Sequence, residues 1–171
     1  GAVATLRPNE GRFGGAVAVE EGTENLAEPL TMSGWSSSNS YAILTPTDVK
    51  YEFLVTAKND ISPSGAFTWK SGIPPGVYSV SCLIKGVGST VGKQVKWQSG
   101  NNPVVGTPVT LSHQYQKLSA VITLETTGAV GPNIPEGFFE GESLLLKNMQ
   151  LEQKPFATSF VDGSREDGIL A

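Results

Sequence analysis

Apolar and polar residues alternate with a period of two through the middle of the chain. The clearest case is residues 77–85, where the apolar positions are Tyr78, Val80, Cys82 and Ile84. Successive side chains of a strand point to opposite faces, so this pattern predicts a strand with one buried face. Similar patterns predict short strands over residues 16–20, 49–57, 66–70, 90–98, 117–125 and 143–152.

The same alternation predicts which side chains enter the core. The inward set of the 117–125 segment comprises Leu118, Ala120, Ile122 and Leu124. The inward set of the 49–57 segment comprises Val49, Tyr51, Phe53 and Val55. The run Leu144–Leu146 is apolar on both faces, which is typical of a strand in the centre of a sheet. Residues 128–137 contain two prolines and three glycines and are expected to form a loop.

Composition supports a fold rich in turns and poor in helix. The 171 residues include 20 glycines and 11 prolines, and no segment has convincing helical periodicity. Charged residues make up 16% of the chain against about 25% in typical domains. Many short strands at spacings of about 8–15 residues indicate one all-β domain, an antiparallel β-sandwich.

Charge and hydropathy exclude several classes of partner. The net charge is −4 and no cluster of Lys and Arg is present, so we expect no nucleic acid partner. No run of 18 apolar residues occurs, so we expect no membrane span. The chain starts without Met and without a signal-peptide pattern, which favours a piece of a longer protein. The single Cys82 excludes an internal disulfide.

Candidate catalytic groups are few. Glu136, Glu140 and Glu142 lie close together in sequence and could provide the paired carboxylates of a glycoside hydrolase. Exposed glutamates on a loop are the more common explanation of such a group. His113 is the one histidine and is expected at the surface. We therefore predict that the chain is not an enzyme and assign no catalytic residue.

Four segments, taken in chain order, resemble one family. The strongest is Asn148–Glu152 (NMQLE), which Pro155–Phe160 (PFATSF) follows. Residues 14–26 (GGAVAVEEGTENL) are similar to the opening of the same modules, and a tryptophan, Trp35, comes soon after. Residues 75–86 and 113–118 are similar to two of their inner strands. The family is the carbohydrate-binding-module-like jelly rolls of bacteriophage tail and other virion proteins, related to xylan- and glucan-binding modules.

This resemblance implies a jelly roll and a place in a virion. It implies a module over residues 16–163, an N-terminal arm or linker over 1–15 and a C-terminal linker over 164–171. The implied function is non-catalytic: binding of a polysaccharide or host cell-surface glycan by a tail fibre or other surface protein, assembled in the host cytoplasm. The alternative is a purely structural or oligomerising module that contacts other virion subunits or copies of itself and has no glycan ligand.

Aromatic rings that stack on sugars, with polar side chains beside them, would form such a site. The aromatic candidates are Trp35, Tyr41, Trp69, Trp97 and Tyr115. Of these, Trp69, Trp97 and Tyr115 are assigned as ligand-binding residues, together with Gln98. Trp69 shares its predicted face with Phe67, and Trp97 with Val95, so either tryptophan could instead belong to the core. Tyr115 has the parity of the outward residues Lys117 and Ser119.

Some members of the related families hold a structural calcium ion between the first and last strands. Glu20 and Glu21 could contribute to such a site. The last strand has Lys147 and Asn148 where an aspartate would be needed. We therefore assign no metal ligand and expect no cofactor.

Overall fold

The computed structural model describes residues 18–20, 22–36, 41–61, 65–99, 102–165 and 168–170. Within these ranges the chain forms strands and one 3-10 helix, η1 (Gly88–Thr90), and no α-helix. No helix in the described ranges is long and apolar enough to cross a membrane.

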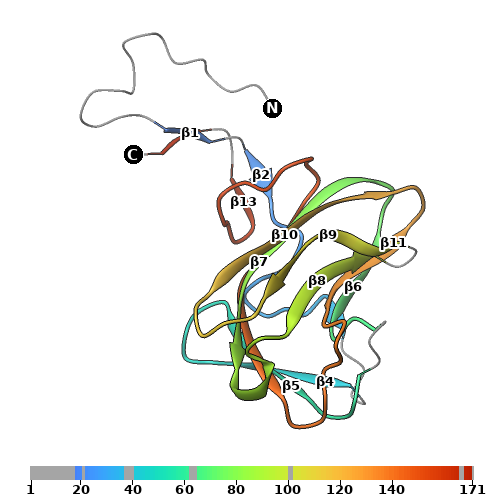
Figure 1. Cartoon of the computed structure of the whole chain (residues 1–171). Coiled ribbons are helices and arrows are strands. Elements are labelled where there is room, and N and C mark those ends of the chain that lie inside the picture. Colours follow the sequence, from blue (N-terminus) through green and yellow to red (C-terminus); the bar gives the residue numbers. More distant parts are fainter. Residues whose placement is uncertain are drawn as a thin grey trace.

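Two five-stranded antiparallel sheets carry most of the strands (Figure 1). The first, called the β12 sheet, has in spatial order β10 (Gln116–Leu124), β7 (Gly76–Val87), β12 (Ser143–Glu152), β5 (Glu52–Ala57) and β4 (Ala42–Pro46). The second, called the β8 sheet, has β3 (Trp35–Ser36), β6 (Trp69–Ile73), β11 (Gly128–Asn133), β8 (Gln94–Ser99) and β9 (Asn102–Thr110). The antiparallel β-sandwich predicted from the alternation is thus confirmed.

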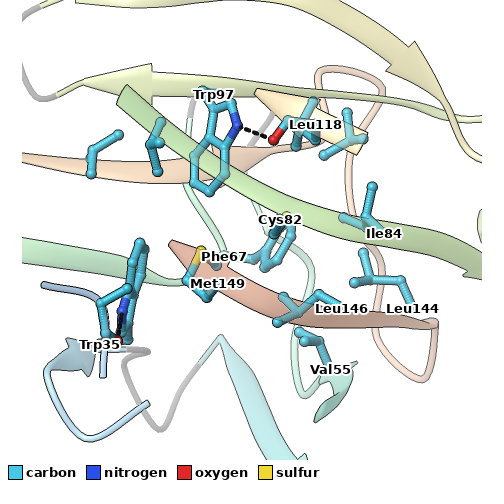
Figure 2. Packing of buried hydrophobic residues seen from close by; sticks show 14 of the residues in the cluster. Trp35, Val55, Phe67, Cys82, Ile84, Trp97, Leu118, Leu144, Leu146 and Met149 are labelled. Carbon is cyan, nitrogen blue, oxygen red and sulfur yellow. Dashed lines mark hydrogen bonds between the residues drawn. The ribbon is translucent and has the colours of Figure 1, made fainter. Parts of the chain in front are cut away.

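Apolar side chains from both sheets fill the space between them (Figure 2). Strand β7 shows why the sequence specifies this layer, because all four apolar positions predicted for its inner face are at most 2% exposed. Strand β10 behaves similarly, and Leu118, Ala120 and Ile122 are buried. The indole nitrogen of Trp97 on β8 donates a 3.0 Å hydrogen bond to the Leu118 carbonyl on β10, which connects the two sheets.

The strand predicted over residues 49–57 begins later than expected. Val49 is 51% exposed and Tyr51 has a φ of 67°, a left-handed conformation that a strand does not allow. The Glu52 amide donates to the Val49 carbonyl and closes a turn. The inward positions of β5 are therefore Phe53, Val55 and Ala57, and the placement of Val49 and Tyr51 in the core was wrong.

The prediction of a loop over residues 128–137 was wrong for its first half. Residues 128–133 form β11, which pairs with both β6 and β8 in the middle of its sheet. Pro132 is tolerated there because it lies opposite Trp97 and its carbonyl accepts a hydrogen bond from the Phe67 amide. The strand predicted over 66–70 is correspondingly shifted to Trp69–Ile73.

Strand β12 occupies the centre of its sheet, as its apolar run predicted. It pairs with β5 on one side and β7 on the other. The register with β7 shifts between Lys147 and Gln150, and Asn148 has a φ of 57°. This β-bulge reverses the parity of the strand: before it Leu144 and Leu146 face the core, and after it Met149 and Leu151 do.

Gln150 and Glu152 thereby face outward from the sheet, yet both are at most 1% exposed. The segment after β12 covers them. Glu152 accepts hydrogen bonds from the hydroxyls of Thr23 (2.9 Å) and Thr158 and from the Thr158 amide (3.1 Å). Gln150 accepts a 2.8 Å bond from the Val161 amide. The polar residues of the NMQLE and ATSF segments therefore attach the C-terminal segment to the sheet.

Asn25 completes this network from the N-terminal side. Its amide nitrogen donates to the carbonyls of Met149 (2.9 Å) and Val161 (2.8 Å), and its amide oxygen accepts from Ala27 and Leu151. All the hydrogen-bonding capacity of this side chain is used. The chain just before the sandwich is thus held against the last strand and the segment that follows it.

Two short pairings lie near the chain ends. Strand β2 (Thr23–Glu24) pairs with β13 (Ser164–Arg165), and β1 (Ala18–Glu20) pairs with β14 (Gly168–Leu170). In Figure 1 the second pair lies outside the sandwich, next to the C-terminus. The predicted arm over residues 1–15 lies outside the described residues, and the predicted C-terminal linker includes β13 and β14.

Replacing Glu152 by Gln should lower the free energy of unfolding by about 2–4 kcal/mol, because the hydroxyls of Thr23, Ser79 and Thr158 and an amide lose a charged acceptor in a buried site. Burial alone would raise the pKa of Glu152, but the hydrogen bonds from Thr158, Gln150 and Thr23 outweigh it and lower the pKa below its ordinary value of 4.5. The folded state therefore binds this proton less readily than the unfolded state, and the stabilisation is present above pH 4.5.

Chemical denaturation across pH measures this effect. The stability difference between the wild type and Glu152→Gln should shrink as the pH falls below about 4.5, as the carboxylate of the folded protein becomes protonated. Glu24→Gln on exposed β2 is the control and should change stability by less than about 0.5 kcal/mol. Equal unfolding free energies for the two variants at neutral pH would contradict the proposed role of Glu152.

Candidate functional site

A pocket of about 290 Å³ lies at the outer side of the β8 sheet. Trp69, at the start of β6, and Gln98 on β8 form two of its walls, and Tyr41, just before β4, forms another. Trp69 and Gln98 are half-buried and Tyr41 is 44% exposed. The structure thus brings two of the four predicted ligand-binding residues together and adds Tyr41. This set of residues is called the Trp69 pocket.

Small residues on β11 form the floor of the Trp69 pocket and leave the space above it free of large side chains. Ala129 and Gly131 line it between Trp69 and Gln98. Gly131 lies opposite Gln98 in the ladder, so both are on the outer side of the sheet. A Cβ at Gly131 would overlap the carbonyl oxygen of Thr68 and the side chain of Ala66. Glycine at this position therefore allows the chain before β6 to cross close to β11.

The lining of the Trp69 pocket is mostly apolar with a few polar groups. An aromatic ring gives a flat apolar surface, and an indole N–H, a phenol and an amide can exchange hydrogen bonds at its edge. This combination suits a ligand that has both an apolar face and hydroxyl groups, such as a sugar ring. The volume is at the lower end of the range for ligand pockets, about 300–1,000 Å³.

Trp97 does not belong to this pocket, although it is a neighbour of Gln98 in sequence. It is 0% exposed, and its indole nitrogen is used by the Leu118 carbonyl (Figure 2). Residues of a strand alternate between its two faces. Because Trp97 points into the core, its neighbour Gln98 points outward. The prediction of Trp97 as a ligand-binding residue is therefore corrected to a core residue. Trp35 is also in the core, with its ring centroid 6.5 Å from that of Trp97.

Tyr115 lies on the other sheet and contacts none of the pocket residues. Its hydroxyl donates a hydrogen bond to the Glu52 carboxylate. The ammonium groups of Lys85 and Lys147 lie 4.6 Å and 4.4 Å from the centroid of its ring. The outward parity predicted for Tyr115 agrees with this position, but the ring is only half-exposed because these side chains surround it.

Electrostatics fix the charge states of this pair. The hydrogen bond from Tyr115 is the main cause that lowers the pKa of Glu52, so Glu52 is ionised at neutral pH. Burial, together with the nearby Glu52 charge, raises the pKa of Tyr115, so its hydroxyl keeps the proton. The residues Tyr115, Glu52, Lys85 and Lys147 are called the Tyr115 cluster.

Two of the three glutamates considered for glycoside hydrolysis have other side-chain contacts, and the third, Glu140, is exposed. Glu142 forms a 2.6 Å ion pair with Lys93 and accepts a hydrogen bond from Ser89. Burial opposes ionisation of Glu142, but these donors lower its pKa, whereas a general acid needs a raised one. Glu136 accepts a hydrogen bond from the Gln94 amide. Glu142 is thus unsuited to the acid role that such a site requires.

Metal-ligand geometry is not found in the part of the chain that the structure describes. No group of three His, Cys, Asp or Glu side chains is close enough there to bind a metal ion. The side chain of Glu20 and all of Glu21 lie outside the described residues, so the calcium hypothesis for them stays untested. Burial raises the pKa of the Cys82 thiol to about 12, which leaves it protonated in the core.

Several pocket and cluster residues were not predicted from the sequence. Ala129 and Gly131 were assigned to a loop, so their place on the outer side of a sheet was missed. Lys85 and Lys147 carried a detectable signal, because each is the single lysine of its strand and follows an apolar residue. The pairing that brings both to one ring depends on sheet order, which the alternation does not give.

Comparison with known proteins bears on the fold. The xylan-binding domain CBM22-1 of Paenibacillus barcinonensis Xyn10C matches with a TM-score of 0.57 and 15% identity, over 82% of this chain and all of that chain. The CBM22-1 and GH10 modules of Clostridium thermocellum xylanase 10B, solved with xylohexaose, match with a TM-score of 0.55 and 13% identity, over 77% of this chain and 28% of that chain.

An arabinose-bound GH51 α-L-arabinofuranosidase matches with a TM-score of 0.53 and 12% identity, over 85% of this chain and 28% of that chain. The fold is the jelly roll of carbohydrate-binding modules. At these identities the likeness concerns the fold alone. No protein-family model and no curated protein matches the sequence.

The three tryptophans can be separated by their exposure. Trp69 is half-buried, whereas Trp35 and Trp97 are at most 7% exposed. Acrylamide should therefore quench one of three fluorescence components, and Trp69→Phe should remove the quenchable component. Trp97→Phe should retain it and lower the free energy of unfolding by about 1–3 kcal/mol, because the Leu118 carbonyl loses its donor. Equal quenching of both variants would show that Trp69 is not at the surface.

Proposed function

We propose that the chain is a non-catalytic glycan-binding module that takes its ligand in the Trp69 pocket. The observation that carries this proposal is the meeting of Trp69, Tyr41 and the Gln98 amide around an open, mostly apolar hollow. A sugar ring placed on Trp69 would bury its apolar face and keep its hydroxyls near polar groups.

The fold supports a binding function over a catalytic one. One of the matching structures is a xylan-binding domain. This support is by fold likeness only, because function depends on the site and not on the fold. Xylan is the first polysaccharide to test, since two of the matching structures are described as xylan-binding or as bound to xylohexaose.

The biological setting we propose is a phage virion, where the module would help adsorption to host cell-surface glycan. This part rests on the sequence resemblance of residues 14–26 and 148–160. A pocket of this size gives modest affinity per copy, and several copies on one particle would multiply it by avidity, by about 10² or more. Assembly with other virion subunits, or as a homo-oligomer, belongs to the same hypothesis.

The structural alternative, a virion module without a glycan ligand, has two sequence features in its favour, the apolar run Leu144–Leu146 and the glycine-rich N-terminal arm, which lies outside the described residues. The apolar run Leu144–Leu146 could have faced a neighbouring subunit. In the fold, two of its residues enter the core and Leu145 is half-buried on the outer side of the central strand β12. The run is thus largely explained within the domain, and this favours the glycan-binding proposal.

A pull-down with insoluble xylan, β-glucan and host cell wall tests the proposal. The wild type should bind at least one of them, and Trp69→Ala should weaken binding by about tenfold or more, because stacking area is lost. Gln98→Ala should weaken it less. Phe156→Ala is the matched control, since Phe156 is an aromatic residue of similar exposure to Tyr41 but outside the pocket.

Two further results decide between the alternatives. Binding that is equally strong in Trp69→Ala and wild type would overturn the assignment to this pocket. Stable oligomers with no binding to any of the three materials would favour the structural alternative. Release of reducing sugars that is lost in Glu140→Gln would show that the chain is an enzyme after all.

A further inference from the structure

The outer face of the β12 sheet carries a group of positive charges. Lys85 is on β7, Lys147 on β12 and Lys117 on β10. Lys147 and Lys117 both lie opposite Leu83, so the three residues form one row across three strands, and Lys85 is a diagonal neighbour on the same face. Glu52, opposite Lys147 on β5, is the carboxylate in this row.

The lysines near Tyr115 are held by its ring. Both ammonium groups lie within 4.6 Å of the ring centroid, a distance at which the aromatic face attracts a cation. Tyr115 is fixed in turn by its hydrogen bond to Glu52, which also accepts a 2.7 Å bond from Thr47. The cations are therefore positioned before any ligand binds, which lowers the entropic cost of binding.

The positive charges outnumber the negative ones on this face. Among the described residues, neither Lys85 nor Lys147 makes an ion pair or a hydrogen bond, and Glu52 attracts both from a longer range. Lys117 is exposed. On the uncovered part of this face three ammonium groups lie against the one carboxylate of Glu52, because the ionised Glu152 on the same face is buried under the C-terminal segment. The net charge of the whole chain is −4. The charge excess is thus local to the face.

A small groove lies beside the cluster, and Leu83, the residue opposite both Lys117 and Lys147, is one of its walls. The groove measures about 130 Å³, and its walls include Leu83, Lys117 and Asn148 and, from the C-terminal segment, Phe160. The edge of the Phe160 ring packs against Tyr51, with centroids 5.0 Å apart, so this wall is supported.

We propose that the Tyr115 cluster and this groove form a second binding site, on the opposite sheet from the Trp69 pocket, for an anionic group carried by a glycan. Lysine ammonium groups bind carboxylates and phosphates through charge-assisted hydrogen bonds. A uronic-acid polymer and a sugar-phosphate polymer share this chemistry. A neutral sugar gains nothing from three ammonium groups, so the site selects for charge.

Calorimetry with oligogalacturonate, with a glycerol-phosphate polymer and with neutral xylohexaose tests this proposal. Lys85→Gln and Lys147→Gln should each weaken binding of the anionic ligand by about tenfold, the effect of one lost charge-assisted hydrogen bond. Raising the salt concentration from 0.05 M to 0.5 M should weaken it further. Neither change should alter binding of xylohexaose.

Lys58→Gln is the control for charge alone. Lys58 is exposed and follows the far end of β5, six residues from Glu52 and so about 20 Å away. The Lys58→Gln substitution removes the same charge from the chain and should leave anion binding unchanged. Thermal melts of all three variants should be within a few degrees of the wild type, because these side chains are half-buried or exposed.

The outcomes separate this proposal from that for the Trp69 pocket. Anion binding that depends on Lys85 and Lys147 and persists in Trp69→Ala supports the second site, even if neutral glycans fail to bind. Lysine-dependent binding of one polymer and not the other also supports it and identifies the anion. Equal affinity for charged and neutral ligands, or equal loss in Lys58→Gln and the two cluster variants, overturns it.

Discussion

A buried carboxylate with neutral donors is the interaction on which the arrangement of the chain ends depends. Glu152 is 0% exposed, and its partners are the hydroxyl groups of Thr23, Ser79 and Thr158 and the Thr158 amide, from three separate segments. A buried charge without enough donors is strongly unfavourable, so all of these segments must be in place together. The strand before the sandwich, the last strand and the segment after it therefore form one cooperative unit.

This unit also determines which part of the β12 sheet remains open to solvent. The bulge at Asn148 turns Gln150 and Glu152 outward, and residues 158–161 cover them. Among these covering residues, Phe160 lines the edge of the groove, and the outer face on the other side of the bulge is left uncovered. The Tyr115 cluster lies on that uncovered part. The same polar motif that attaches the C-terminal segment thus sets the boundary of the groove.

Local pattern was sufficient for much of the fold and failed where a neighbour decides the conformation. The alternation in 77–85 and 117–125 predicted the inner faces of β7 and β10, because apolar and polar residues alternate in a strand that has one solvent-exposed face. Strand β11 was missed since glycine and proline normally mark turns; here a close crossing beside Gly131 requires the small residue. The start of the strand at Glu52 was missed because the turn before it uses Tyr51, not a glycine, in the left-handed conformation, so the sequence carries no turn signal there.

The candidate site, too, could be predicted only in part from the sequence. Trp69 and Gln98 could be selected from residue type, and their meeting could not, since it depends on β6 and β8 lying on either side of β11. The parity argument placed Trp69 with Phe67, but Phe67 precedes the strand and is buried against Phe138, with centroids 5.4 Å apart. Residue type chose the candidates, and only sheet order could separate a core tryptophan from a surface one.

The two candidate sites lie on opposite faces of the sandwich, and this separation affects how a polymer could bind. The Trp69 pocket is lined by side chains of the β8 sheet and its neighbouring loops and by Tyr41, which precedes β4 at the edge of the other sheet, whereas the Tyr115 cluster lies on the β12 sheet. The close-packed core lies between the two sites. Affinity for a polymer that carries both neutral and charged units would then grow by avidity between copies, since one glycan segment cannot reach both faces of the same copy.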